Sequence, residues 1–144
     1  MSIEGIYLWP VSRGEPVIVE RVVAKAGVGL AGDRKRGKKR QVTLLNADDW
    51  AEATCEAGSD AAPMWRRANL VLRGVRFSPA SVGRRLRIGA VVLKIMGETT
   101  PCDHMDMLHA GLRQALVPGW RGGVFCTIES GGEIAVGQAI ALVD

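Results

Sequence analysis

Short apolar runs separated by glycine-containing turns recur along almost the whole chain, and this pattern restricts the fold more than any other feature. The 144 residues include 18 glycines. Tight turns accommodate glycine well, whereas helix interiors do not, so the pattern predicts many short strands rather than long helices. The expected strands cover residues 1–9, 16–24, 41–45, 69–72, 84–88, 91–96, 124–129, 133–136 and 140–143.

Glycine turns between consecutive strands predict two hairpins. Residues 84–88 and 91–96 flank one such turn, and residues 124–129 and 133–136 flank the other. Many adjacent strands joined by short turns are typical of barrels. We therefore expect a mainly β fold, a closed or nearly closed β-barrel, in a single domain over residues 1–144.

About two short helices are expected to accompany the strands. Asn46 is a suitable N-cap for a helix over about residues 47–55, because its side chain can accept a hydrogen bond from the first turn. A second helix is expected after Cys102, ending near Val117. Its apolar residues at helical spacing are Met105, Leu108, Leu112 and Leu116.

Composition excludes some classes of protein. Hydrophobic residues make up 47% of the chain and charged residues 24%, which is too apolar for a largely disordered protein. The net charge of +4 favours an anionic ligand without requiring one. The sequence shows no secretory h-region and no apolar run of membrane length, and its three cysteines form no disulfide framework. We therefore expect a cytoplasmic protein that does not bind a membrane.

Cys102 lies in residues 97–105, the stretch in which reactive chemistry is most expected. Pro101 suits a helix entrance, so Cys102 should lie at or just before a helix N-terminus. Unpaired backbone N–H groups there favour a thiolate, which can bind a soft metal, attack an electrophile or carry sulfur. The alternative is that Cys102 is a small buried hydrophobe, as Cys55 and Cys126 are expected to be.

Residues 34–40 form a strongly basic run, preceded by a glycine-containing loop that ends at Gly32 and Asp33. Such a run could bind nucleic acid, but no aromatic residues alternate with it to form a stacking platform. A solvated loop over residues 35–39 is the favoured interpretation, so nucleic acid binding is not expected. Arg34 and Arg40, at the two ends of the run, have fixed backbones and could point into a pocket.

Other arginines also lie at the ends of expected strands. Arg66 and Arg67 precede the strand that begins at Asn69, and Arg121 precedes Gly122 and another strand. Arginine binds phosphate with two parallel hydrogen bonds, and adjacent glycines let backbone N–H groups approach a ligand. These positions are consistent with an anion pocket, although each arginine alone could be a surface ion-pair partner.

Two further kinds of site are weakly indicated. Cys102, His104 and His109 supply zinc ligand types, but no paired Cys or His spacing typical of zinc sites is present. A hydrolytic Cys–His pair is also possible, although no third group that would orient the histidine can be identified.

The chain resembles the MOSC domain, named for the C-terminal domain of molybdenum-cofactor sulfurases. The resemblance runs from about residue 27 to residue 143 and depends on the order of several short segments. They are residues 29–34, 40–46, 66–75, 82–89, 100–102 and 121–124. The resemblance implies a β-barrel with a pocket for the phosphorylated pyranopterin of the molybdenum cofactor (molybdopterin), an anionic ligand.

By position, the resemblance makes Cys102 the metal ligand or the carrier of transferable sulfur. The other candidates for cofactor binding are Gly32, Asp33, Arg34, Arg40, Arg67, Asn69, Arg121 and Gly122. Full-length sulfurases join this domain to a pyridoxal-phosphate desulfurase, but the sequence contains no lysine motif for pyridoxal phosphate. A stand-alone domain would need a separate donor protein for electrons or sulfur.

Three functions are therefore considered, and whether the protein is an enzyme stays open. The first is a molybdenum-cofactor-binding redox protein that reduces small N-oxygenated compounds, with Cys102 on the metal. The second is a sulfur carrier that uses a Cys102 persulfide to supply a cofactor or a metal cluster. The third is a basic binding module without chemistry, which would use the loop over residues 35–39.

Overall fold

A computed structural model of the chain describes residues 1–143. Short strands dominate it, as the glycine-separated runs predict. The strands are β1 (Ser2–Leu8), β2 (Val17–Val19), β3 (Arg21–Lys25), β4 (Gly29–Leu30), β5 (Val42–Asn46), β6 (Leu70–Arg73), β7 (Arg85–Ile88), β8 (Val91–Glu98), β9 (Val124–Ser130), β10 (Gly132–Ala135) and β11 (Ala141–Val143). The α-helices are α1 (Ala47–Ala57), α2 (Asp103–Leu108) and α3 (Leu112–Leu116), and the 3₁₀-helices are η1 (Pro63–Arg66), η2 (Pro79–Ser81) and η3 (Pro118–Trp120).

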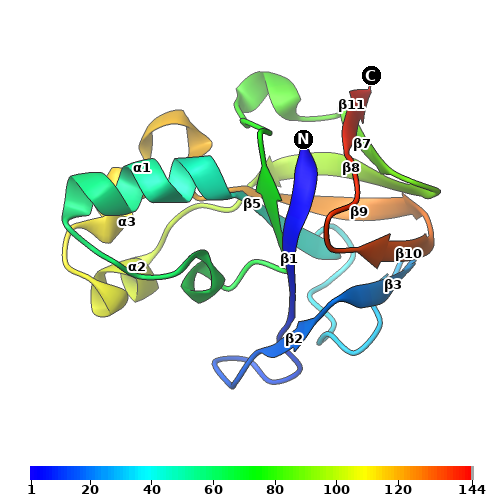
Figure 1. Cartoon of the computed structure of the whole chain (residues 1–144), viewed down its shortest axis with the longest axis horizontal. Helices are drawn as coiled ribbons and strands as arrows, with labels where there is room; N and C mark the ends of the chain where they lie inside the picture. The colour runs from blue at the N-terminus through cyan, green and yellow to red at the C-terminus, as the bar shows by residue number, and fades with distance from the viewer. Residues whose placement is uncertain (144) are drawn as a thin grey trace.

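Two sheets curl around a common core (Figure 1). The larger has the strand order β11-β7-β8-β9-β5-β6-β1-β2, and the smaller has the order β10-β3-β4. The segment before β11 also pairs with β1, because the N–H of Ile3 donates to the Gln138 carbonyl (3.0 Å) and the N–H of Ile140 to that of Met1 (3.0 Å). These bonds bring the two ends of the chain together. The prediction of a mainly β, nearly closed barrel is confirmed.

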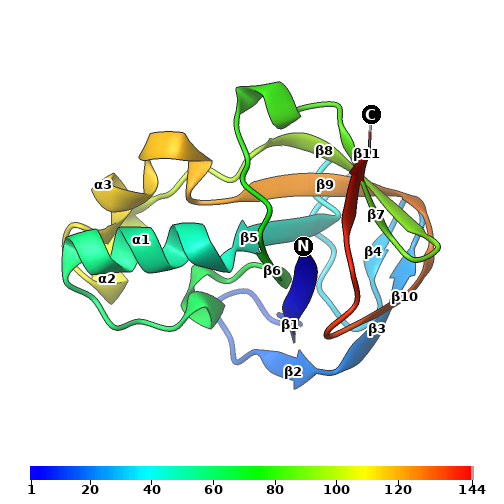
Figure 2. The same cartoon turned by 45° about the horizontal axis from the view of Figure 1, so that its top comes forward.

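The helices form a second layer at one end of the larger sheet, as Figure 2 shows. Strand β5 is buried along its whole length because the barrel core covers one face and the helices cover the other. Leu44 belongs to the barrel core, and Leu45 packs with Trp50 of α1 and Leu112 and Leu116 of α3. None of the described helices is long and apolar enough to span a membrane.

The prediction of one continuous helix after Cys102 is wrong, because two short helices, α2 and α3, occupy this segment. Gly111, with φ of 89°, separates α2 from α3. The helical spacing of apolar residues correctly predicts three buried positions, because Met105, Leu112 and Leu116 all belong to the same buried cluster. Leu108, by contrast, is 38% exposed. Residues 1–143 therefore contain three α-helices rather than about two.

The hairpin predicted for residues 124–129 and 133–136 is also wrong. Strand β9 pairs with β5 and β8, whereas β10 pairs with β3 of the smaller sheet. A Cβ on Gly131 would lie 2.7 Å from the carbonyl oxygen of Ala24, so the glycine permits a close crossing between sheets. The run over residues 16–24 likewise splits into β2 and β3, one in each sheet. The other predicted hairpin, β7–β8, is confirmed.

Candidate functional site

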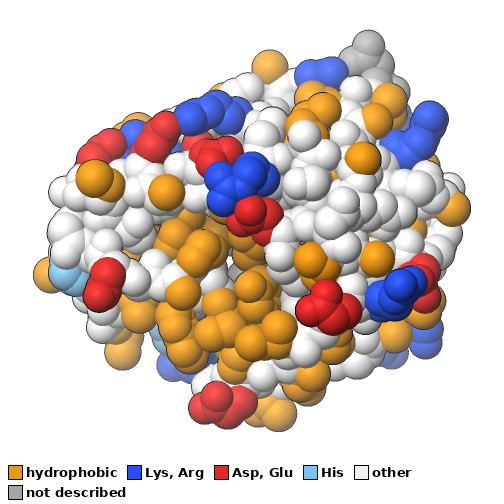
Figure 3. All heavy atoms as spheres, viewed as in Figure 1, with side chains coloured by type: hydrophobic (Ala, Val, Ile, Leu, Met, Phe, Trp, Pro, Cys, Tyr) orange, Lys and Arg blue, Asp and Glu red, His pale blue; other side chains and the backbone are white. Residues whose placement is uncertain are grey.

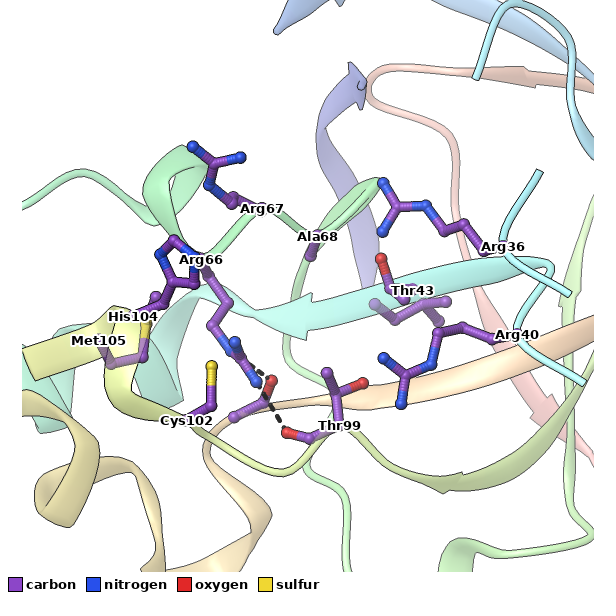
Figure 4. Close-up of a pocket in the computed structure, with 12 residues that line it drawn as sticks. Arg36, Arg40, Thr43, Arg66, Arg67, Ala68, Thr99, Cys102, His104 and Met105 are labelled. Carbon is purple, nitrogen blue, oxygen red and sulfur yellow. Dashed lines mark hydrogen bonds between the residues drawn. The ribbon is translucent and has the colours of Figure 1, made fainter. Parts of the chain in front are cut away.

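A pocket of about 140 Å³ opens where the start of β5, the end of η1, the β8–α2 connection and the turn before β9 meet (Figure 4). Its walls combine guanidinium groups, one thiol and a few apolar side chains. The lining residues are Arg36, Arg40, Thr43, Leu44, Arg66, Arg67, Ala68, Thr99, Cys102, His104, Met105 and Gly122.

Cys102 is the N-cap of α2, so its predicted place at a helix start is confirmed. Its side chain is exposed and makes no capping hydrogen bond. The alternative of a buried, structural cysteine is therefore wrong for Cys102. The expectation of burial is confirmed for Cys126, which is fully buried in the barrel core, where burial raises the pKa of its thiol strongly. It is wrong for Cys55, which is exposed near the end of α1.

Arg66 is the most deeply buried charge in this pocket. Its Nε donates to the carbonyl oxygen of Gly122 (2.9 Å) and its Nη2 to that of Thr99 (2.8 Å). Burial lowers the pKa of Arg66 to about 10, and an electrostatic interaction with Cys102 partly opposes that shift. In Figure 4 the sulfur of Cys102 lies beside this guanidinium. Arg66 thus ties two pocket segments together and places a positive charge near the thiol.

Gly122 and Gly123 allow the chain to come close enough for these Arg66 hydrogen bonds. A Cβ on Gly122 would lie 2.7 Å from the Thr99 carbonyl oxygen, so only glycine lets the chain approach the β8–α2 connection this closely. Gly123 has φ of 93° and passes against the carbonyl of Leu44. The turn before β9 can therefore present the Gly122 carbonyl to Arg66.

Arg36 reaches the pocket because Asp33 holds it. The Asp33 carboxylate accepts a hydrogen bond from Arg36 Nε (3.0 Å) and another from the Trp9 backbone N–H (2.8 Å). The side chains of Arg36 and Asp33 are 8% and 1% exposed. Asp33 therefore serves the pocket by fixing an arginine instead of lining it.

Arg40 and Arg67 have no carboxylate partner within the described part of the chain. Arg40 lies 4.9 Å from the ring centre of Phe125, and Arg67 lies 4.9 Å from that of Trp9. Figure 4 shows Arg40 reaching toward Thr99 from the side opposite Arg66, while Arg67 extends away from Cys102. Both guanidinium groups keep donors free for a ligand.

Of the residues proposed from the sequence, the pocket brings together Cys102, Arg40, Arg67 and Gly122. Gly32, Asp33, Arg34, Asn69 and Arg121 do not line it. Arg34 donates to the Trp9 carbonyl (3.2 Å), and burial lowers the pKa of its guanidinium. Gly32 has φ of 87° in the turn that leads to Asp33.

Asn69 and Arg121 act at a distance from the pocket. Asn69 is fully buried, and its Oδ1 accepts hydrogen bonds from the backbone N–H (3.1 Å) and hydroxyl (3.3 Å) of Thr43. Arg121 instead faces α1, where it bonds Glu56 (2.8 Å) and the carbonyl of Ala115 (2.9 Å). Asn69 thus braces a pocket strand, and Arg121 attaches the turn before β9 to the helices.

The sequence indicates Arg66 only as one of several arginines at strand ends and does not single out Arg36 or Thr99, although all three line the pocket. Arg36 was assigned to a solvated loop, and the acidic residue three positions before it was the one available signal of its burial. Thr99 Oγ1 is buried without a hydrogen-bond partner among residues 1–143. A buried hydroxyl in a pocket wall is a group that a ligand or water would satisfy.

The residues described do not assemble a conventional metal site. Within residues 1–143, no three side chains of His, Cys, Asp or Glu gather where they could hold a metal ion. The His109 ring bonds the carbonyl of Ala57 at the end of α1 (2.9 Å). The zinc alternative therefore has no ligand set here.

The family model described as "MOSC domain" matches residues 31–141. The YuaD protein from Bacillus subtilis has a similar structure, with a TM-score of 0.83 and 17% identity over 98% of this chain and 94% of that chain. YiiM from Escherichia coli has a TM-score of 0.72 and 18% identity over 100% of this chain and 70% of its own. YiiM from Geobacillus stearothermophilus has a TM-score of 0.71 and 14% identity over 99% of this chain and 73% of its own. No curated protein sequence matches the chain.

Proposed function

The chain is a member of the MOSC domain family, which is linked to binding and sulfuration of the molybdenum cofactor, and from this membership we propose that Cys102 and the neighbouring arginines hold that cofactor. The protein would then be a redox module that reduces small N-oxygenated compounds. A separate protein would supply the electrons. Substitutions of residues that line the pocket can test this proposal.

The observation that carries the proposal is a buried guanidinium, with no carboxylate hydrogen-bonded to it, beside an accessible thiol. Arg66 is 8% exposed, and its two hydrogen bonds are to backbone carbonyls, not to a carboxylate. A buried charge without an ionic partner is costly, so a protein keeps one chiefly where a ligand of opposite charge completes it. Arg40 approaches the same space, so the pocket attracts an anion.

The donor set fits a metal that arrives with its own organic ligand. One protein thiolate cannot hold a free metal ion, and the described residues offer no further cluster of metal ligands at this pocket. A thiolate suits a soft coordination site on molybdenum, and the arginines suit a phosphate group. When bound, the cofactor would supply oxygen-atom and electron transfer. The protein's residues would orient it and balance its charge.

The size of the pocket also bears on the proposal. At about 140 Å³ it is smaller than the roughly 300–1,000 Å³ of pockets that enclose drug-sized ligands. It can therefore enclose one polar end of the cofactor, with the remainder lying across the open surface. Loss of a single arginine should then weaken binding without abolishing it.

Metal analysis after loading with the molybdenum cofactor tests the proposal. The wild type and Cys55→Ala, which removes the other exposed cysteine, are expected to retain equal molybdenum after desalting. Cys102→Ala should retain little, and Arg40→Gln an intermediate amount. Retention of wild-type molybdenum by Cys102→Ala would contradict the role of the thiol.

Exposure of the Cys102 thiol also supports the alternative of a sulfur carrier. In that case a donor persulfide would pass its outer sulfur to the Cys102 thiolate and itself leave as a thiolate. Intact-protein mass spectrometry would then show one added sulfur on the wild type and on Cys55→Ala, but not on Cys102→Ala, and no bound molybdenum.

A further inference from the structure

A second hollow lies between the β3–β4 turn and the basic loop over residues 34–40, and it shares no lining residue with the pocket around Cys102 (the thiol pocket). Its volume is about 260 Å³. The lining residues are Gly27, Val28, Lys35, Gly37 and Lys38. The same loop supplies Arg36 and Arg40 to the wall of the thiol pocket. A partner bound over the lysines of the loop therefore lies next to the thiol pocket.

The backbone of the loop is held in both halves, although its lysines are exposed. The first half is fixed through the contacts of Arg34 and Arg36 described above. In the second half the carbonyl of Lys38 accepts from Gln41 Nε2 (2.8 Å), and Gln41 Oε1 accepts from the Ile128 N–H (2.8 Å). Gln41 is itself buried. The lysines are thus presented by a backbone that needs little ordering when a partner binds.

Positive charge on the loop is not balanced by acidic groups. From residue 21 to residue 47 Asp33 is the only acidic residue, and its carboxylate is buried and already paired. Within residues 1–143, no carboxylate forms an ion pair with Lys35, Lys38 or Lys39. These three side chains, which we call the loop lysines, therefore keep their charge available to a partner.

Basic side chains near α1, by contrast, have acidic neighbours. Figure 3 shows acidic and basic side chains directly beside one another over the start of this helix. There Arg73 pairs with Glu4 (2.6 Å) and Asp48 (2.7 Å). Since opposite charges are interspersed near α1 and not at the loop, the loop is the better surface for a partner of negative charge.

We propose that the loop lysines dock the acidic surface of the protein that supplies electrons to the cofactor proposed for the thiol pocket. This inference rests on the proposed function, which requires such a donor, and adds the charge of the donor and the place where it binds. A one-electron donor is oxidised by one electron in each encounter. Two encounters supply the two electrons that, with two protons from solvent, convert an N–OH group to N–H and water.

The hollow suits a transient protein complex. Complexes between electron-transfer proteins bury less than about 1,200 Å² in total, and opposite charges guide the partners together. The hollow offers two lysines and one apolar side chain, that of Val28, which is 49% exposed. This is much charge and little apolar area, the reverse of a permanent interface.

Single-stranded nucleic acid is the alternative polyanion. Its binding sites combine positive charge with aromatic side chains on which the bases stack. Of residues 1–143, none that lines the hollow is aromatic, and the Phe125 ring lies 4.9 Å from the Arg40 guanidinium that covers it. The observations therefore favour an acidic protein, and nucleic acid binding becomes an outcome of the test.

Protein-observed NMR titration with a plant-type [2Fe–2S] ferredoxin, an acidic one-electron donor, tests the inference. The ferredoxin is expected to bind saturably at low ionic strength and to broaden the amide signals of residues 35–39, because its cluster is paramagnetic. Raising the ionic strength from about 0.02 M to about 0.2 M should weaken binding about tenfold, because salt screens exposed charges. Lys35→Glu and Lys38→Glu should each weaken binding about fivefold or more at low ionic strength.

Arg87→Glu is the matched control, because it makes the same change in net charge at an exposed residue of β7 outside the loop. Its affinity for ferredoxin should stay within about twofold of the wild type. Equal losses in Arg87→Glu and Lys38→Glu, or no saturable binding of ferredoxin, would overturn the inference. Tighter binding of single-stranded oligothymidylate than of ferredoxin, lost in Lys38→Glu, would overturn it in favour of nucleic acid.

The same variants separate this inference from the proposed function. Wild-type retention of molybdenum together with ferredoxin binding that Lys38→Glu leaves unchanged would overturn the docking surface and leave the proposed function standing. Ferredoxin binding that depends on the loop lysines, in a protein that retains no molybdenum, would overturn the proposed function and leave the docking surface standing.

Discussion

Arg66 and Arg67 are neighbours in the chain, yet their guanidinium groups lie in different surroundings. Arg66 is buried and bonds two backbone carbonyls, whereas Arg67 lies over Trp9 with donors free. Arg67 is the C-cap of η1 in a left-handed conformation, which reverses the chain between the two side chains. A short 3₁₀-helix thus sends one arginine inward as a brace and the other over the Trp9 ring.

Substitution of Arg66 by methionine is expected to destabilise the fold. Two charge-assisted hydrogen bonds are lost, and the carbonyls of Thr99 and Gly122 lose their donor. The expected loss in free energy of unfolding is about 3 kcal/mol. Urea denaturation measures it, with Arg67→Met as the control that should lose less than about 1 kcal/mol. Equal losses in the two variants would contradict the brace role of Arg66.

At this scale the sequence predicted the positions of some candidate residues and not those of others. Cys102, Arg40, Arg67 and Gly122 line the pocket as expected because each lies in or beside a turn next to a strand or helix end. The positions of the other candidates depend on long-range partners that spacing does not reveal. Arg121, for example, faces α1 because Glu52 and Glu56 lie there, 69 and 65 positions earlier in the chain.

Helix α1 connects the candidate site to the rest of the fold. Its N-cap Asn46 accepts from the Asp48 N–H (3.4 Å), and its acidic face bonds arginines from two separate turns. Arg76 bonds Asp49 and Glu52, and Arg121 bonds Glu52 and Glu56. The helix therefore attaches the turn before β9 without contributing a residue to the pocket.

Arg121→Gln and Arg40→Gln are expected to have opposite effects. Arg121→Gln removes ion pairs to α1 and should lower the midpoint of thermal unfolding while leaving the affinity for inorganic phosphate unchanged. Arg40→Gln removes a donor from the pocket and should weaken phosphate binding about tenfold with little change in stability. Calorimetric titration and thermal unfolding of both variants measure this. A loss of phosphate affinity in Arg121→Gln would place that residue back in the site.

Asp49, in the first turn of α1, provides a test by pH. Burial raises the pKa of its carboxyl, and the Arg76 guanidinium opposes the rise in part. A carboxyl whose pKa is raised on folding contributes stability at low pH, and this contribution is lost as the pH rises through the raised pKa. Asp49→Asn, which stays uncharged, should therefore increase the free energy of unfolding slightly at pH 7 and change it little at pH 3.

Urea denaturation at the two pH values measures the effect, and exposed Asp60→Asn is the control, expected to show no such difference. A variant that is destabilised at pH 7 relative to pH 3 would show that the Arg76 contact outweighs burial. The orphaned Asp49 Oδ2, which has no partner in the described residues, favours burial as the dominant effect.

Short sequence motifs predicted the elements whose structure depends on neighbouring residues. They did not predict strand pairs that form between distant parts of the chain. The Asn46 cap fixes the start of α1, and the turn between β7 and β8 fixes their hairpin, so both appear as expected. The glycines at 131 and 132 resemble a hairpin turn, but the partner of β10 is β3, more than a hundred residues earlier. Pairing between distant strands leaves no trace in the spacing of one short segment.

The whole molecule contains two cores of unequal extent. The barrel core draws on strands from both sheets, while the helix core is a smaller cluster against the outer face of β5. The barrel was predicted from the number of short strands and from the family resemblance. Backbone hydrogen bonds between the first strand and the segment before β11 close the barrel in part. Which residues form these bonds depends on strand register, and the sequence does not predict it.

Amide hydrogen exchange should differ between the barrel core and the smaller helix core. Strand β5 is buried throughout, whereas α2 anchors itself by Met105 alone and leaves Asp103, Asp106 and Met107 exposed. Amides of α2 are expected to exchange on the order of a hundredfold faster than those of β5, because short helices with few buried contacts open locally. Peptide-resolved exchange at neutral pH measures the ratio. Similar rates in the two elements would contradict the division.

The residues that line the thiol pocket are spread along the sequence from Arg36 to Gly122. During synthesis the N-terminal strands leave the ribosome well before the turn that carries Gly122, and Arg66 has no partner carbonyl there until that turn has emerged. The hydrogen bond between Arg66 and Gly122 therefore forms only after that turn has been synthesised, and the thiol pocket cannot be complete before then.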